Sequence, residues 1–280
     1  MPRLFIPSLI LLFAGSALAQ PVPPKSGGTA RPDTSRAHSR PHAAKEQLDQ
    51  TARLPNVIFI LADDLGYGDL GCYGHPYAKT PNIDSLAKNG MRFTRFYATG
   101  VTCQPSRVGF MTSRHPRSFE RRVGDFGFGD RKTITELLRN NGYATGHFGK
   151  WHIGDQEPTR PHNRGYDETC GLMYSNDMWE FHPENPEYWG RHPLQFWDNG
   201  EVTIERVTKA DQRMLTTWYT EHAVDFIRRH GSEPFFLYVP HSMPHVPLFC
   251  SKEFEGRSGK GLYGDVMLEL DWSVGQINNA

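Results

Sequence analysis

Val57-Ile58-Phe59-Ile60-Leu61-Ala62-Asp63-Asp64 is the stretch that indicates the fold most directly. Its apolar residues, most of them β-branched or aromatic, predict a short strand that is buried on both faces of a sheet. Two carboxylates follow the apolar residues directly. Because ligands of open α/β sheets bind at the carboxyl ends of the strands, this pair is a candidate binding site.

Segments on either side of this stretch alternate between helix and strand signals. Thr80 precedes a proline, and Gly90 follows the last apolar position, which predicts a helix between them. Further helices are expected at residues 133–140, 211–230 and 264–278, and further strands at 91–98, 143–148 and 235–239. Residues 158–202, rich in Pro, Trp, His and Asn, are expected to form long loops that build a binding surface. The alternation predicts an α/β sandwich with helices on both faces of the sheet.

Composition excludes several classes of protein. The chain has 280 residues, with 31 Lys+Arg against 31 Asp+Glu, and this balance argues against a nucleic-acid-binding protein. Hydrophobic residues make up 38% of the chain, enough for a buried core. Four cysteines are too few for a disulfide scaffold, and they show no paired zinc spacing.

The N-terminal residues have the pattern of a secretory signal peptide. Arg3 precedes an apolar run, and Ala17-Leu18-Ala19 provides a cleavage site, so residues 1–19 are expected to be removed. A membrane anchor is the alternative, but the run is too short to span about 30 Å of hydrocarbon. Residues 20–53 are rich in Pro, Gly, Ser and Arg and are expected to be a disordered linker. We therefore expect an exported protein, periplasmic or extracellular and free of the membrane after cleavage, with a folded domain at 54–280.

Asp63 and Asp64 are candidate metal ligands. Adjacent carboxylates repel each other unless a cation is shared between them, and such oxygen ligands suit calcium or magnesium. A turn or a helix cap would explain the same two residues without a metal. The pair alone leaves both readings open.

Two further segments contain residue types that often take part in catalysis. Cys103-Gln104-Pro105-Ser106-Arg107 fits the first turn of a helix, which places a thiol where backbone N–H groups favour an anion. In the extended segment that ends at Lys150-Trp151-His152, the cation and the imidazole point the same way. Such a pair can stabilise an oxyanion and move a proton. A buried structural cysteine, an exposed lysine and a packed histidine are the alternatives.

Together these segments resemble the sulfatase family. Residues 103–107 match its C-x-P-S-R signature, and residues 148–154 match its G-K-W-H-L-G box. Residues 54–73 resemble its opening strand and metal loop, and the resemblance extends over 54–280. It implies an alkaline-phosphatase-like α/β/α sandwich with a mostly parallel central sheet. It also implies that the C-terminal part of the catalytic domain is missing, because the family's Asp-Asn metal ligands follow the last helix of this chain.

The resemblance implies a nucleophile and a cofactor. A formylglycine-generating enzyme would oxidise Cys103 to formylglycine, and one hydroxyl of its hydrate would attack the sulfur of a sulfate ester. Asp63 and Asp64, together with residue 103, would hold calcium, with magnesium the less favoured ion.

The resemblance also assigns roles to the other residues of the site. Arg107 would steady the hydrate, and Lys150 would bridge it to the sulfate. His152 would accept a proton from the hydrate. His245 would contact the bridging oxygen, and Ser175 would be a further sulfate contact.

The sequence is compatible with three functions. The first is an arylsulfatase-type sulfuric ester hydrolase that acts on a small sulfate ester or a sulfated glycan. The second is a catalytically impaired, truncated sulfatase. The third is a phosphatase or phosphodiesterase of the same superfamily, which would use Ser or Thr where this chain has Cys103. Asp198-Asn199-Gly200 lies upstream of His245, in the wrong order for the missing metal ligands, and is read as a turn.

Overall fold

The computed structural model describes residues 9–15, 54–118 and 131–280. The predicted linker at 20–53 and most of the predicted signal peptide lie outside the described residues. One folded unit includes residues 9–15 and 55–280.

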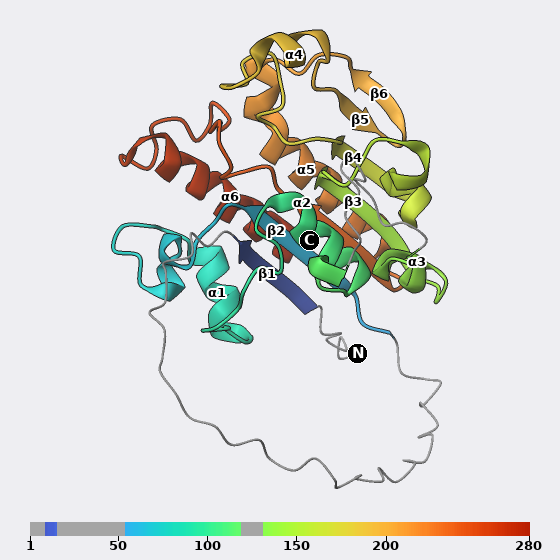
Figure 1. The fold of residues 1–280 in the computed structure, drawn as a ribbon. Helices are drawn as coiled ribbons and strands as arrows, with labels where there is room; N and C mark the ends of the chain where they lie inside the picture. Colours follow the sequence, from blue (N-terminus) through green and yellow to red (C-terminus); the bar gives the residue numbers. More distant parts are fainter. Residues whose placement is uncertain (1–8, 16–53, 119–130) are drawn as a thin grey trace, which may run out of the picture. The chain divides into compact units, whose positions relative to one another are not determined.

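A mixed sheet forms the centre of this unit, with strand order β1-β2-β7-β3-β4-β5-β6 among the described residues (Figure 1). The strands are β1 (Leu9–Gly15), β2 (Val57–Asp63), β3 (Ala144–Lys150), β4 (Glu168–Leu172), β5 (Phe196–Asp198), β6 (Glu201–Ile204) and β7 (Phe235–Pro240). Neighbours from β1 to β4 pair in parallel, while β5 and β6 add antiparallel. The predicted mostly parallel sheet is confirmed.

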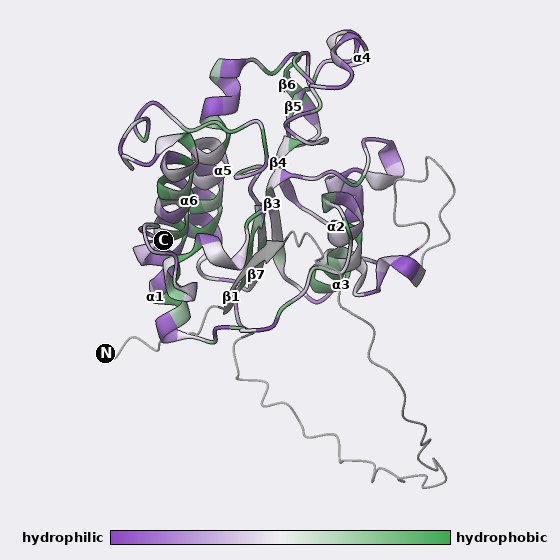
Figure 2. Cartoon of the chain, turned by 60° about the vertical axis from the view of Figure 1, so that its left-hand side comes forward, coloured by the Kyte–Doolittle hydropathy of each residue, from purple (hydrophilic) through white to green (hydrophobic). Residues whose placement is uncertain are grey.

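Helices cover both faces of the sheet. The α-helices are α1 (Pro81–Asn89), α2 (Cys103–Thr112), α3 (Ile134–Arg139), α4 (Pro186–Arg191), α5 (Lys209–His230) and α6 (Gly261–Asn279). Short 3-10 turns lie at Tyr67–Asp69, Gly71–Tyr73, Pro116–Ser118, Glu157–Thr159 and Pro161–Arg164. Figure 2 shows α1, α5 and α6 on one side of the sheet, and α2 and α3 on the other. This layering confirms the α/β sandwich. Within the described ranges, no helix has both the length and the apolarity to cross a membrane.

Alternation along the central strands supplies two apolar clusters, one for each face. In β7, Phe235, Leu237 and Val239 belong to the cluster that α5 and α6 cover. Phe236 and Tyr238 belong to the cluster beneath α2 and α3. All five are almost completely buried, and burying a large apolar side chain stabilises the fold by about 1.5–3 kcal/mol. Buried side chains on both faces hold the strand ends in place. Asp63 and Lys150 lie at the ends of β2 and β3.

Residues 9–15, within the predicted signal peptide, form β1 at the edge of the sheet. β1 pairs in parallel with β2 from Leu9–Val57 to Gly15–Asp63. The open edge of β2 can therefore accept an apolar strand. Cleavage after residue 19 stays a prediction.

Two predictions of local structure are wrong. Residues 91–98 form no strand, and Met91 and Tyr97 are 77% and 74% exposed. The segment finds no partner strand among the described residues; instead, carbonyl groups of Phe93 and Phe96 accept hydrogen bonds from tyrosine hydroxyls. The supposed long loops at 158–202 contain β4, α4 and β5 and enter β6. Burial against α5 outweighs the loop-like composition there.

Candidate active site

Asp63 ends β2 as a buried carboxylate between two cations. Its Oδ2 atom contacts Lys150 Nζ and lies 3.3 Å from a guanidinium nitrogen of Arg107. Burial alone would raise the pKa of Asp63, but the charges of Lys150 and Arg107 hold it below its ordinary value. The carboxylate is therefore ionised and compensated by positive charge.

Asp64 differs from its neighbour in both conformation and exposure. Its backbone φ is +61°, in the left-handed region that costs a non-glycine residue free energy and that is frequent at functional sites. The Asp64 side chain is 43% exposed, and its Oδ2 lies 3.6 Å from His245 Nε2. The two adjacent carboxylates thus present one buried and one accessible oxygen donor at the same strand end.

Lys150 ends β3 and is completely buried. Its ammonium donates a hydrogen bond to Ser175 Oγ at 2.9 Å, and its carbonyl accepts one from Arg107. The residue before it must be glycine, because Gly149 has φ +149° and a Cβ there would lie 2.1 Å from the carbonyl oxygen of Pro240. This close approach of β3 to the end of β7 fixes the position of the lysine.

Cys103 and His152 meet at the N-terminus of α2. The Cys103 Sγ atom lies 3.1 Å from His152 Nδ1. His152 also has a left-handed backbone, with φ +56°. Burial and the nearby charges of Lys150 and Arg107 lower the pKa of His152 well below its ordinary value. The imidazole is therefore neutral and can accept a proton from the group at position 103.

The segment that contains Ser175 is tied to the segment that contains His245. Asn176 Nδ2 donates to the carbonyl of Pro247 at 3.1 Å, which keeps both segments at the same edge of the sheet. His241, in contrast, is fully buried and lies 3.2 Å from the Ser273 hydroxyl; burial lowers its pKa to about 4. This environment gives His241 a structural role in the core.

All the residues that the sequence nominates therefore lie around one point, at the carboxyl ends of β2, β3 and β7. Tyr238 of β7, which no sequence pattern nominates, is a buried residue that interacts electrostatically with Arg107. Within the part of the chain that the structure describes, its hydroxyl has no hydrogen-bond partner. The alternation of β7 could have placed Tyr238 on the α2 face, but nothing in the sequence indicates its proximity to Arg107. Asp198-Asn199-Gly200 forms the predicted turn, with φ values of +48° and +86° at Asn199 and Gly200 in the hairpin between β5 and β6.

The oxygen donors fit a hard cation in kind but not in number. Asp63 and Asp64 provide two carboxylates, whereas calcium takes 6–8 oxygen ligands. Within the described ranges, neither belongs to a group of three Cys, His, Asp or Glu ligand atoms close enough to share one ion. Lys150 and Arg107 compensate the charge of Asp63 in this structure.

Comparison with known proteins decides the family. Residues 55–280 match the family described as Sulfatase. The chain belongs to the sulfatase family. It is 36% identical to human arylsulfatase A over 253 residues, which cover 82% of this chain and 49% of that protein. It is also 36% identical to human N-acetylgalactosamine-6-sulfatase over 251 residues, covering 80% of this chain and 46% of that protein.

A solved sulfatase has the same fold. The crystal structure of the PsFucS1 sulfatase from Pseudoalteromonas sp. superposes with a TM-score of 0.70 at 28% identity, covering 81% of this chain and 52% of that one. The chain thus spans about half the length of the curated sulfatases it matches, and the alkaline-phosphatase-like fold is confirmed.

Proposed function

We propose that this chain is the N-terminal portion of a formylglycine-dependent sulfatase that hydrolyses sulfate esters. The observation that carries the proposal is the contact of Cys103 with a neutral His152 beside the Asp63–Lys150–Arg107 cluster. Oxidation of Cys103 to formylglycine by a maturation enzyme would supply the nucleophile. Asp63 and Asp64, with residue 103, would hold calcium in preference to magnesium, and the ion would supply Lewis-acid stabilisation of the sulfate charge.

The protein's own side chains then have separate tasks. His152 accepts a proton at Nδ1 from the group at position 103, because its pKa is too low for it to be protonated already. Arg107 is held by Asp63 and by the Lys150 carbonyl, so that its charge faces position 103 from a fixed direction. These contacts restrict the orientations of His152 and Arg107 before substrate binds, which favours preorganised electrostatic stabilisation.

Three side chains are placed to receive the sulfate group. Lys150 and Ser175 are hydrogen-bonded to each other and present an ammonium and a hydroxyl at the same place. His245 is half-buried beside the exposed Asp64, where it can reach the oxygen that leaves with the alcohol. A cationic cluster with several hydrogen-bond donors suits a tetrahedral oxyanion.

The names of two relatives support the proposed substrate class. One related sulfatase is named for aryl sulfates and another for N-acetylgalactosamine 6-sulfate, which supports a sulfate ester of a small molecule or a sulfated glycan. The proposal includes export to the periplasm or the extracellular space after cleavage near residue 19. It includes no nucleic-acid partner and no membrane attachment after cleavage.

A phosphatase or phosphodiesterase of the same superfamily is the rival activity. The position that would carry Ser or Thr in such an enzyme is Cys103, within an intact C-x-P-S-R sequence. This residue choice favours sulfate over phosphate esters.

The experiment that tests the proposal examines residue 103 directly. Co-expression with a formylglycine-generating enzyme should yield a peptide containing residue 103 that is lighter than the cysteine form, because an aldehyde oxygen replaces the S–H group. Cys72 is the internal control, since it lacks Pro and Arg at the matching offsets. Unmodified cysteine at both positions would refute the proposed nucleophile.

Activity tests the rest of the proposal. The 280-residue chain should hydrolyse aryl sulfate poorly, because Asp63 and Asp64 are too few ligands for calcium. A version extended by the C-terminal part of a related sulfatase should release sulfate in a calcium-dependent reaction, and the Cys103→Ala variant of that version should be inactive. Faster hydrolysis of an aryl phosphate than of the matching sulfate would favour the rival activity.

A further inference from the structure

A second group of metal-ligand side chains lies outside the residues assigned to sulfate chemistry. Cys170 in β4, Asp198 in β5 and His222 in α5 each bring one ligand atom within 4.8 Å of the other two. Within the described residues, this is the group of three Cys, His, Asp or Glu atoms that could share an ion. The register of the sheet brings two of the ligands together, because Cys170 and Asp198 are directly paired on adjacent strands.

Packing of α5 on the sheet fixes the third ligand. Trp218, one turn before His222, contacts the ring of Phe196 with centroids 5.1 Å apart, and Phe226, one turn after it, contacts Phe148 at 5.8 Å. His222 lies between these two anchors, with its own ring 5.5 Å from that of Phe148. The imidazole is therefore held over β4 by aromatic contacts on the same helix face.

The cluster contains polar atoms that the described residues leave without partners. Oδ1 of Asp198 is buried and has no hydrogen-bond partner in residues 9–15, 54–118 and 131–280. No hydrogen bond of the Cys170 thiol or the His222 ring joins either group to another described residue. A buried carboxylate oxygen without a donor is unfavourable, and a cation would remove that cost.

We propose that Cys170, Asp198 and His222 bind a zinc ion, at a site separate from the calcium ligands Asp63 and Asp64. One sulfur, one nitrogen and one oxygen form a borderline-soft ligand set that suits zinc and not calcium or magnesium. Thiolate and carboxylate charges would neutralise the divalent ion. Ligand atoms bound to one zinc lie about 3.3–3.8 Å apart, so side-chain shifts of about 1 Å close the site.

Such a site would join three elements of the fold. β4 and β5 meet where the sheet changes from parallel to antiparallel, and α5 lies across them. Asp198 and His222 are only half-buried, which gives the ion a path from solvent and allows water as a fourth ligand. Zinc binding would therefore stabilise this part of the sheet, independently of the proposed sulfate chemistry.

Cobalt(II) provides the test, because it replaces zinc and reports a thiolate ligand by its absorption. The full chain carrying Cys103→Ala, which removes the thiol of the other site, should develop a sulfur-to-cobalt charge-transfer band on titration with cobalt. Cys170→Ser in the same background should abolish the band. Cys250→Ser is the matched control, since Cys250 is as buried as Cys170 (1% exposed in both cases) and should leave the band unchanged.

A second variant distinguishes the loss of a ligand from misfolding. His222→Gln removes a half-buried ligand without opening the core, and it should weaken cobalt binding by about 10-fold or more. Zinc should raise the melting temperature of the parent chain and of Cys250→Ser, but not of His222→Gln. A parent chain without the charge-transfer band, or a band of equal strength in His222→Gln, would overturn the zinc site.

Discussion

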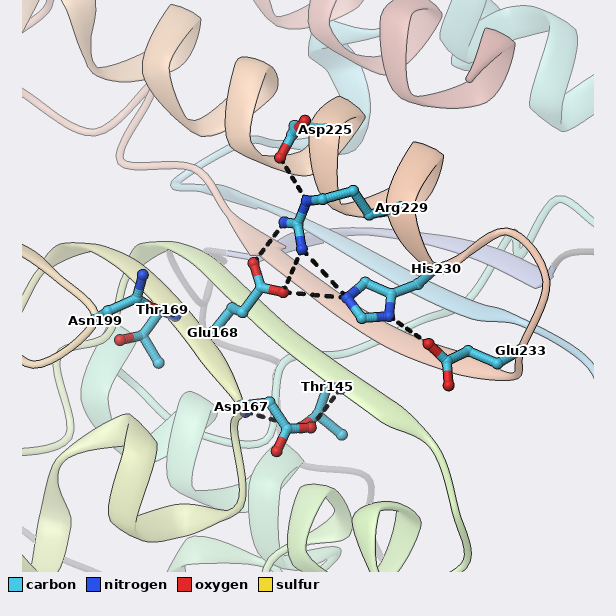
Figure 3. A network of polar contacts seen from close by, with 9 residues as sticks. All are labelled: Thr145, Asp167, Glu168, Thr169, Asn199, Asp225, Arg229, His230 and Glu233. Atoms are coloured by element: carbon cyan, nitrogen blue, oxygen red, sulfur yellow. Dashed lines mark hydrogen bonds and ion pairs between the residues drawn. The ribbon is translucent and has the colours of Figure 1, made fainter.

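Two charge clusters of similar composition occupy different regions of the sheet. Asp63, at the carboxyl end of β2, is paired with Lys150 and Arg107, and all three side chains are at most 5% exposed. Glu168, at the start of β4, forms a two-pronged ion pair with Arg229 of α5, with side chains 26% and 47% exposed (Figure 3). The Asp63 cluster is buried away from solvent, and the Glu168 cluster is partly exposed to it.

This difference decides what each cluster can do. Removing three charges from water is costly, and their mutual attraction repays the cost only while every partner is present. An exposed pair loses little hydration and gains little. Selection for stability alone gives no reason to bury Lys150, whereas a reaction that transfers an anionic group does. The buried cluster therefore indicates function, and the exposed one indicates a local link between β4 and α5.

The largest expected difference between the clusters is in catalysis. In the extended enzyme with formylglycine at position 103, Lys150→Gln should lower turnover of an aryl sulfate by about 10²–10³-fold, the usual loss for one preorganised donor. Arg229→Gln, the matched change in the exposed cluster, should leave turnover unchanged. Equal losses in both variants would show that the first effect is structural.

Stability should separate the clusters next. Asp63→Asn keeps the shape of the side chain but leaves Lys150 and Arg107 buried without their counter-charge. We expect a loss of about 3–5 kcal/mol in the free energy of unfolding, measured by urea denaturation of the 280-residue chain. A loss below 1 kcal/mol would mean that water or a bound anion compensates the two cations.

A third prediction concerns a histidine beside the buried cluster. His147 lies in a cage formed by Trp151, Tyr166 and Tyr238, with ring centroids 5.2–5.5 Å away, and neither side-chain nitrogen has a hydrogen-bond partner among the described residues. Burial, with a contribution from the charge of Arg107, lowers its pKa to about 3. The unfolded chain binds a proton at this residue near its ordinary pKa of 6.5, so stability falls as the pH drops from 6.5 towards 3.

His147→Phe should remove this acid sensitivity. Relative to the parent, the variant should gain about 2 kcal/mol at pH 5, because 1.36 kcal/mol applies to each pH unit below 6.5. Near pH 7 the two proteins should differ by much less. Urea denaturation at both pH values measures the effect, and His192→Gln, which changes an exposed histidine, should leave the pH profile as it is.

Local signals explain why much of the fold and the site could be predicted. The apolar run of β2 ends at Asp63 in sequence and in space, and Pro105 marks the first turn of α2 as expected. The sheet brings Lys150 to the same edge because parallel strands share their carboxyl ends. In each case, the residues that carry the signal are neighbours in the chain.

What escaped prediction depends on partners that are distant in the chain. Residues 91–98 have the composition of a strand, but strand formation needs a free edge in register, which no local pattern reports. Cys170, Asp198 and His222 span 52 positions without any metal-binding spacing. They meet because β5 turns back on β4 and α5 crosses both, and single-sequence periodicity contains no such information.

The smallest expected effect tests the exposed cluster itself. The hydrogen bond from Arg229 holds the pKa of Glu168 below its ordinary value of 4.5, against the opposing effect of partial burial and with further help from His230. A carboxylate with a lowered pKa in the folded state stabilises the protein above pH 4.5, and this stabilisation disappears as the pH falls through the lowered value.

Glu168→Gln should therefore cost about 1 kcal/mol or less at pH 7, a decrease in melting temperature of about 2–4 °C at most. The difference from the parent should shrink at high salt, and it should disappear as the pH falls through the lowered pKa of Glu168, because both side chains are then neutral. Thermal denaturation at pH 7 and at a descending series of acidic pH values, each at low and high salt, measures both dependences. A loss of several kcal/mol that persists in acid would mean that Glu168 acts through packing, and that exposure is not what distinguishes the two clusters.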